Sequence, residues 1–166
     1  MGYRNKTYVI FDGDKDMWAY AYMKGWRTRD HIDFDFHDAH ELRVLTDRAS
    51  EDTIRSRLRE RLGNTKQAIV LIGESTKNLF RFVRWELEMC VKYSIPLVAV
   101  NLNGHRAMDS AHCPAIIRDE YVVHVDFKMK IIQHALNQFP DEYFKRPLGA
   151  TGSRHYSNDV YQRLGI

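Results

Sequence analysis

At residues 68–72 the sequence reads Ala-Ile-Val-Leu-Ile, and Gly73 closes this run. A short, uninterrupted apolar run rich in β-branched residues is typical of a strand that is buried on both faces, as in the middle of a parallel sheet. The glycine indicates a turn directly after the strand. The run therefore predicts an α/β domain built around a parallel sheet.

Strand and helix patterns alternate on both sides of this run. Apolar runs at residues 8–11, 96–100 and 121–125 predict further buried strands. Apolar and acidic residues alternate over residues 32–36, which predicts a half-exposed edge strand. Amphipathic helices are predicted between the strands, over residues 16–25, 50–63, 77–93 and 127–139. We therefore expect a mainly parallel sheet with helices on both faces, and ligands at the carboxyl ends of its strands.

Composition limits the class of protein. The chain has 166 residues, of which 44% are hydrophobic and 28% charged, and this fits one globular domain. A net charge of +3 is too small to predict nucleic-acid binding, and the arginines within residues 55–61 fit a solvated helix face. No apolar run approaches the roughly 20 residues of a membrane helix, and residues 1–6 lack an apolar signal segment. We expect a cytoplasmic protein with neither a membrane nor a nucleic-acid partner.

One charged residue interrupts the apolar face of the third predicted helix. Phe82 and Cys90 belong to this face, and Glu86 lies four residues from each. Its neighbour Glu88 falls on the outer face, where it can pair with Arg84. A carboxylate in an apolar stripe is costly unless it is paired, hydrogen-bonded or open to a cleft. The pattern alone leaves two interpretations open: a structural carboxylate, or one that lines a pocket and does acid–base work or binds sugar hydroxyls.

The predicted strand ends carry further polar residues. Asp12, Asp14 and Asp16 can hold a divalent cation, but turn formation and helix capping are the simpler interpretation. Residues 73–77 offer backbone amides to a phosphate, or they form a turn and a helix cap. Neither a GxGxxG motif nor a P-loop is present.

Histidine, cysteine and tryptophan give weaker signals. His37 and His40, together with His112 or Cys113, are a conceivable zinc set, but ordinary loop histidines are the simpler interpretation. The two cysteines form neither a disulfide framework nor a CxxC motif, and Cys90 is predicted to be a small core residue. The three tryptophans, at positions 18, 26 and 85, could stack on a ring of a ligand, but core positions are the simpler prediction.

Three of these segments resemble a known family. They are residues 8–12, residues 68–77 and residues 82–87, which read Phe-Val-Arg-Trp-Glu-Leu. The chain is similar to the TIR-like family that includes the TIR-like subunits of Thoeris anti-phage defence systems. TIR domains have a Trp in the third of these segments, a Glu four positions later and then a Leu; here Phe82 and Glu86 take the first two positions. The resemblance implies a flavodoxin-like, three-layer α/β fold with a five-stranded, mainly parallel sheet.

The resemblance also implies an activity. Catalytic members cleave NAD at the nicotinamide–ribose bond with an essential Glu, which assigns catalysis to Glu86. By the same resemblance Phe11, Asp12 and Phe82 are expected to bind substrate. The segment after the first strand is acidic where TIR domains usually have Ser, Tyr or basic residues, and Lys77 is expected to offset this charge towards an anionic dinucleotide. NAD enters as substrate, and no metal or other cofactor is expected.

The expected product is a cyclic or otherwise modified ADP-ribose that activates a partner effector, and a homo-oligomer is expected to complete the site. Two alternatives stay open: a non-catalytic TIR-like binding or assembly module, and a nucleoside deoxyribosyltransferase-like enzyme, which also uses a Glu on a related fold. The expected division is a TIR-like domain over residues 1–140 and an aromatic tail over residues 141–166, packed on the domain or on a partner.

Overall fold

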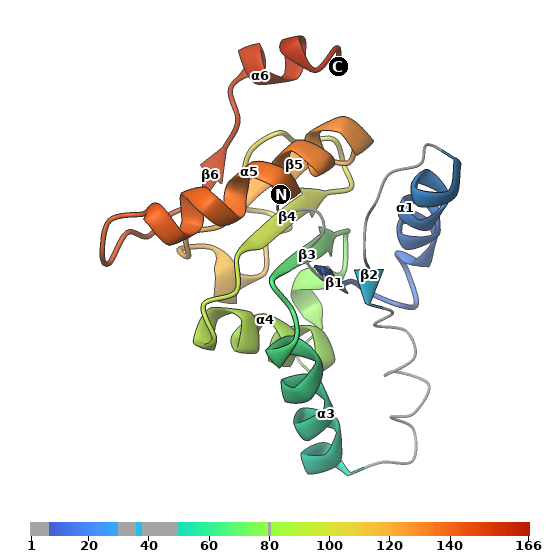
Figure 1. Ribbon diagram of the computed structural model, residues 1–166. Coiled ribbons are helices and arrows are strands. Elements are labelled where there is room, and N and C mark those ends of the chain that lie inside the picture. The colour runs from blue at the N-terminus through green and yellow to red at the C-terminus, as the bar shows by residue number, and fades with distance from the viewer. Residues whose placement is uncertain (1–6, 30–35, 38–49, 80) are drawn as a thin grey trace.

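A computed structural model describes residues 7–29, 36–37, 50–79 and 81–166 of the chain. Within these residues a parallel sheet runs through the molecule in the order β2-β1-β3-β4-β5-β6 (Figure 1). The strands are β1 (Thr7–Ile10), β2 (Phe36–His37), β3 (Gln67–Ile72), β4 (Leu97–Asn101), β5 (Val123–Asp126) and β6 (Arg154–His155).

The middle strands of the sheet are buried along their whole length. Every residue of β1, β3 and β4 is buried, as the run at residues 68–72 predicted. In the register of the sheet, Ile69 of β3 lies between Val9 of β1 and Val98 of β4. The chain passes from β1 to β2 on one side and then crosses to β3 on the other, so the strand order reverses between β1 and β3. Ligands of open α/β sheets bind outside the carboxyl ends of the strands at such a point.

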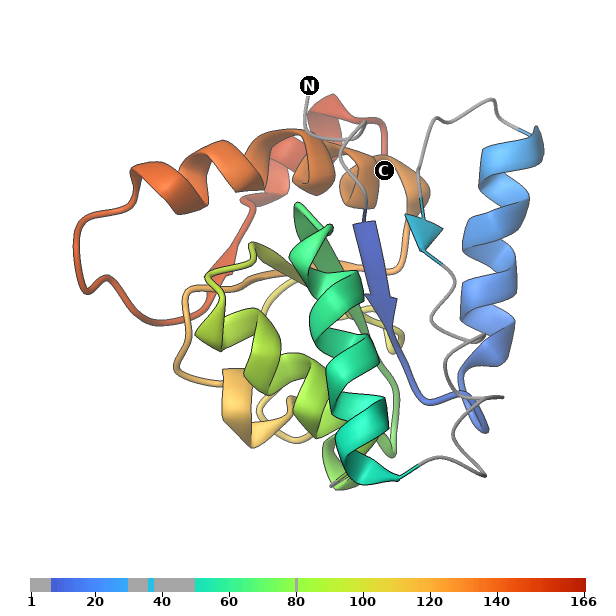
Figure 2. The ribbon, with the colours of Figure 1, turned by 60° about the horizontal axis from the view of Figure 1, so that its bottom comes forward.

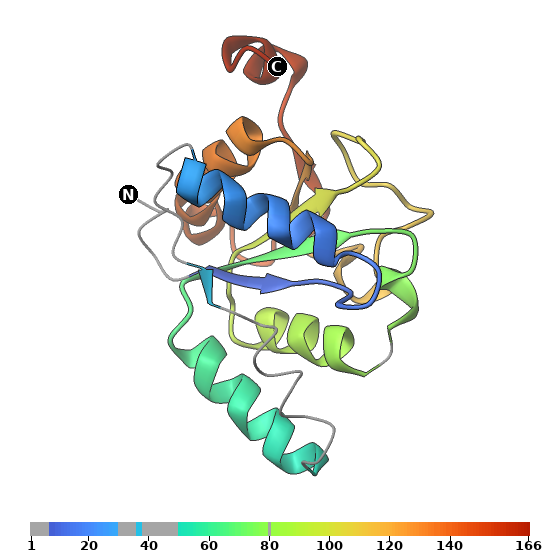
Figure 3. The ribbon, with the colours of Figure 1, turned by 90° about the vertical axis from the view of Figure 1, so that its right-hand side faces the viewer.

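Helices cover both faces of the sheet and complete a three-layer α/β fold. Figure 3 shows α1 and α5 above the sheet and α3 and α4 below it. In Figure 2, α3 and α4 lie side by side, and β1 runs beside α3. None of the described helices combines the length and apolar character that crossing a bilayer requires. The helices are α1 (Met17–Arg29), α3 (Glu51–Gly63), α4 (Phe82–Lys92), α5 (Met129–Lys145), α6 (Asn158–Arg163) and the 3₁₀ turns η3 (Thr76–Asn78) and η4 (Ala115–Ile117).

The helix α3 has the bounds that its sequence predicted. The Ser50 side chain caps it by accepting a hydrogen bond from the Thr53 amide. Its buried residues, Ile54, Leu58 and Leu62, are the predicted apolar stripe. Of the basic residues between them, Arg57 and Arg59 are exposed as predicted, whereas the Arg55 guanidinium lies over the Trp85 ring at 4.2 Å.

Two other helices differ from their predicted bounds. The helix predicted from residue 77 begins at Phe82, because residues 76–78 form the separate turn η3. The hydroxyl of Thr76 fixes this turn by accepting a hydrogen bond from the Gly73 amide at 2.9 Å. The last predicted helix continues beyond residue 139 to Lys145, with Pro140 buried inside it. The edge strand predicted at residues 32–36 overlaps β2 at its last residue, and the rest lies outside the described residues.

The C-terminal segment adds β6 to the edge of the sheet beside β5. Beyond it, Tyr161 of α6 is fully buried, and its hydroxyl accepts a hydrogen bond from the Asp126 amide at 3.2 Å. The Arg106 guanidinium lies 4.1 Å from the centre of the Tyr161 ring and donates to Asn158. The segment thus packs on the sheet and on the loop after β4, while the proposed division at residue 140 falls inside α5 and stays a prediction.

Candidate functional site

The carboxylate of Glu86 is buried on α4. The residue lies in the second turn of the helix and is only 2% exposed. Its helix neighbours Leu87 and Cys90 are fully buried, so the apolar face predicted from the sequence is confirmed. Glu88 lies on the outer side and pairs with Arg84 at 2.9 Å, also as predicted. The same helix therefore carries one buried carboxylate and one solvated carboxylate.

A hydroxyl from the sheet meets this buried carboxylate. The Tyr8 phenol, on β1, donates a hydrogen bond to Oε1 of Glu86 at 2.9 Å. Tyr8 is itself fully buried, so this bond joins α4 to the sheet in an environment where electrostatic interactions are strong. Burial and the Glu86 carboxylate together raise the pKa of the Cys90 thiol, which keeps Cys90 neutral and consistent with the predicted core role.

Phe11 lies on the other face of the sheet. Side chains alternate along a strand, and Tyr8 points towards α4. Phe11 instead stacks on Tyr20 of α1, with ring centroids 4.8 Å apart. Because α1 and α4 cover opposite faces (Figure 3), the Phe11 ring and the Glu86 carboxylate are not brought together.

Two further predicted substrate-binding residues lie near the start of α4. Phe82 is its first residue, one turn before Glu86, and its ring packs edge-on against Trp85 at 5.8 Å. Lys77 lies in η3 and donates to the Ala111 carbonyl, at the edge of a cavity of about 300 Å³ between α4 and η4. Glu86 is not among the residues that line this cavity. The roles of these residues in binding stay predictions.

Two acids join the end of β1 to the end of β3. The Asp12 carboxylate accepts hydrogen bonds from the Asp14 amide and from the Ser75 hydroxyl, each at 2.9 Å. Asp16 lies next to Thr76, and burial and the Asp12 charge raise the pKa of its carboxyl. Both acids are nearly buried, at 5% and 6% exposed. These contacts are those of a structured turn.

No group of three potential metal ligands is found among the residues that the structure describes. His40 lies outside that part of the chain, as does the side chain of His37, so the zinc set predicted from the sequence is not placed. Cys113 is buried, and burial raises the pKa of its thiol to about 11.

A larger cavity, of about 540 Å³, opens at the carboxyl ends of β1, β3 and β4. We call it the strand-end cavity. Its lining includes Asp16 and Trp18 at the start of α1, Gly73 and Ser75 after β3, and His112 from the loop after β4. Trp18 was predicted to be a core residue, and this was wrong: it is 49% exposed, whereas the other two tryptophans are 8% exposed. Glu86 is not among the lining residues.

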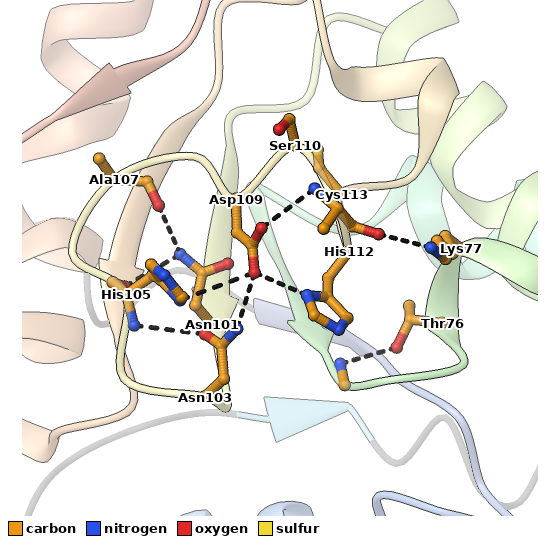
Figure 4. A network of polar contacts seen from close by, with 12 residues as sticks. Thr76, Lys77, Asn101, Asn103, His105, Ala107, Asp109, Ser110, His112 and Cys113 are labelled. Carbon is orange, nitrogen blue, oxygen red and sulfur yellow. Dashed lines mark hydrogen bonds and ion pairs between the residues drawn. The ribbon is translucent and has the colours of Figure 1, made fainter.

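A polar network supports one wall of the strand-end cavity (Figure 4). Oδ2 of Asp109 accepts hydrogen bonds from Nδ1 of His112 at 2.6 Å and from the Asn103 amide at 2.7 Å. These bonds lower the pKa of the Asp109 carboxyl to about 2. His112 was predicted only as a possible zinc ligand, and Asp109 was not predicted as a site residue. The Asp-x-x-His spacing at residues 109–112 could have indicated that the two side chains pair, but such a spacing is a weak signal in a loop.

The chain matches a family model described as the Thoeris protein ThsB, TIR-like domain, over residues 8–107. It is also similar to the TIR domains in a solved structure of the activated Roq1 resistosome directly recognizing the pathogen effector XopQ. That likeness has 14% sequence identity and a TM-score of 0.41, and it covers 61% of this chain and 60% of that chain. The family match covers more than half of this chain and includes β1, β3, β4 and α4 with Glu86. The protein therefore belongs to the ThsB TIR-like domain family of Thoeris anti-phage defence.

Proposed function

We propose that the protein cleaves NAD at the nicotinamide–ribose bond, with Glu86 as the catalytic carboxylate, and releases an ADP-ribose product as a defence signal. The observation that carries the proposal is the buried Glu86 on α4. The sequence resemblance matches this residue to the Glu that catalytic members of the family use. An apolar helix face does not retain a carboxylate for packing alone, because burying it is costly.

The arrangement around Glu86 suits an oxocarbenium-like transition state. The glycosidic bond breaks with its electron pair going to the nicotinamide ring, which leaves as a neutral molecule. Positive charge then develops on the ribosyl group, where a buried carboxylate stabilises it more strongly than water-exposed charge does. The Tyr8 hydroxyl holds Oε1, so the Glu86 carboxylate has a fixed orientation. Water, or a second nucleophile of the substrate, captures the cation and loses a proton.

Burial sets a condition on this mechanism. Because Glu86 is 2% exposed, atoms that cover it must be displaced before a ribose can reach its carboxylate. Assembly of several copies is one way to stabilise such an opened state, and we include a homo-oligomer in the proposal. The cyclic or modified ADP-ribose product would then act on a separate effector in the cytoplasm.

The helix α4 offers a matched pair of variants for the test. Glu86→Gln removes the buried carboxylate, and Glu88→Gln removes the solvated one on the same helix. The purified protein, alone and with lysate from phage-infected cells, is incubated with NAD, and nicotinamide is quantified by chromatography. We expect release by the wild type and by Glu88→Gln, and a loss of at least about 100-fold in Glu86→Gln, in line with the loss of a group that acts in the transition state. Unchanged release by Glu86→Gln would exclude the assigned role.

A non-catalytic assembly module is the second candidate. It is favoured by the hydrogen bond from Tyr8 and by the absence of Glu86 from the linings of both cavities described above. This alternative predicts no nicotinamide release under any condition, and unaltered self-association of Glu86→Gln in light scattering. Nucleosides are assayed beside NAD, because a deoxyribosyltransferase-like enzyme would exchange their bases and leave NAD intact.

A further inference from the structure

The strand-end cavity has the size and position of a ligand site. Its volume of about 540 Å³ falls within the usual range for small-molecule pockets, and it lies beside the point where the strand order reverses. Since Glu86 does not line it, the cavity is separate from the carboxylate to which NAD cleavage was assigned. Ligand binding in this cavity therefore does not depend on the Glu86 carboxylate.

Trp18 gives the cavity an aromatic surface. The ring is held by edge-on contacts with Phe127 at 5.6 Å and Tyr22 at 6.3 Å between centroids, and half of its surface stays exposed. An indole that is fixed by its neighbours and still exposed loses little entropy when a planar ring stacks on it. The aromatic wall thus fits a heterocyclic base.

His112 presents a ring nitrogen on another wall. Its Nδ1 is engaged by the Asp109 carboxylate at 2.6 Å, which fixes the orientation of the ring. Figure 4 shows the ring between Asp109 and Thr76, with its second nitrogen on the side away from Asp109. His112 belongs to the lining of the cavity, and a ribose hydroxyl can hydrogen-bond this second nitrogen as donor or as acceptor.

Asp16 adds a carboxyl group from the side of β1. It is almost buried, with Thr76 as a neighbour, and it lines the same cavity. Polar groups on two sides of a cavity match the paired hydroxyls of a ribose. Among the described residues, two acids, Asp16 and Glu74, line the cavity beside the single cation Lys15, and this balance disfavours a phosphate there.

We propose that the strand-end cavity binds the ribonucleoside part of a nucleotide, with the base on Trp18 and the ribose hydroxyls on Asp16 and His112. Any phosphates extend outward past Lys15. The site does not depend on NAD cleavage, and a non-catalytic protein would bind the same group.

Tryptophan fluorescence gives a direct readout, because Trp18 is far more exposed than the other two tryptophans. The wild type is titrated with adenosine, 2′,3′-dideoxyadenosine, ADP-ribose and inorganic phosphate, and isothermal calorimetry repeats each titration. Adenosine and ADP-ribose are expected to bind. The dideoxy compound should bind at least about tenfold more weakly, because it lacks the hydroxyls that Asp16 and His112 would hydrogen-bond. Phosphate alone should not bind.

The variants localise the site. Trp18→Leu and His112→Gln are expected to weaken adenosine binding in calorimetry by about fivefold or more, the range of base stacking and of a lost hydrogen bond. The control Tyr93→Leu removes an exposed aromatic residue at the end of α4 and should bind within about twofold of the wild type. Thermal melts of each variant show that a loss of binding is not a loss of folding.

Each result decides one proposal. No binding of adenosine at millimolar concentration, equal binding of the dideoxy compound, or unchanged binding by both cavity variants overturns the ribonucleoside site. Glu88→Gln, on the outer side of α4, should bind adenosine as the wild type does. If no nicotinamide is released but adenosine binds at Trp18, then the cleavage proposal fails and this one stands.

Discussion

His124 is a titratable group buried inside the fold. It lies on β5 in register with Ala99 of β4 and His155 of β6, and it is fully buried. Neither of its ring nitrogens has a hydrogen-bond partner in the described part of the chain. Burial, and to a lesser extent the neighbouring His155, lowers its pKa from 6.5 to about 4. We predict that this residue makes the protein lose stability in mild acid.

The size of the effect follows from the two pKa values. In the unfolded chain the His124 imidazole takes up a proton near pH 6.5, whereas in the folded chain it stays neutral down to about pH 4. The free energy of unfolding is thus at its full value above pH 6.5, and it falls as the pH drops towards 4 because protonation then favours the unfolded chain. The shift corresponds to about 3.4 kcal/mol in full, at 1.36 kcal/mol per pKa unit, and about 2 kcal/mol of it is lost between pH 7 and pH 5.

Urea unfolding at pH 7, 6 and 5 measures this loss. The reference is His124→Leu, which keeps an apolar side chain at the site and cannot titrate there. His134, whose pKa burial also lowers, and Asp16 titrate in both proteins, so their contributions cancel in the comparison. The free energy of unfolding of the wild type should fall by about 2 kcal/mol more than that of the variant. Equal pH dependence in the two proteins would show that folded His124 takes up its proton as readily as the unfolded chain does.

Three further predictions concern stability and are measured by urea unfolding at pH 7. Ser50→Ala removes the cap of α3 and should cost about 1 kcal/mol, whereas a cost near zero would mean that water replaces the cap. Tyr8→Phe leaves the buried Glu86 carboxylate without the phenol donor and should cost about 1–3 kcal/mol. The exposed Tyr93→Phe is its control and should stay within about 0.5 kcal/mol; equal effects would contradict the importance of the Tyr8 bond. Gly73→Ala places a methyl group against the Asp16 carboxylate and should cost about 1–3 kcal/mol. In an Asp16→Ala background the same change should cost much less, and an unchanged cost would refute the clash.

Local patterns in the sequence predicted the parts of the fold that have a clear period. The continuous run at residues 68–72 predicted β3, and the apolar spacing around Glu86 predicted its burial before any partner was known. The start of α4 was predicted too early. The turn at residues 76–78 is held by the Thr76 hydroxyl, a contact that leaves no periodic trace in the sequence.

The carboxyl ends of the strands were predicted as the place for a ligand, and the strand-end cavity lies there. The individual side chains of its wall were harder to predict, because they come from three separate loops. Trp18 has the sequence context of a core residue. In the fold one edge of its ring packs on Phe127, and half of its surface stays exposed. The pairing of Asp109 with His112 depends on the course of the loop after β4. The two-residue strand β6 is too short for any alternation to be visible.

The packing of Tyr161 shows that the folded domain extends beyond the segment that matches the family. The family match ends at residue 107, yet the hydrophobic core of the same sheet includes β5, α5 and the Tyr161 ring. A fragment trimmed to the matched residues would have an unpaired edge on β4 and would expose the apolar surface that α5 covers. Recombinant fragments and domain fusions of this protein should therefore keep the chain through α6.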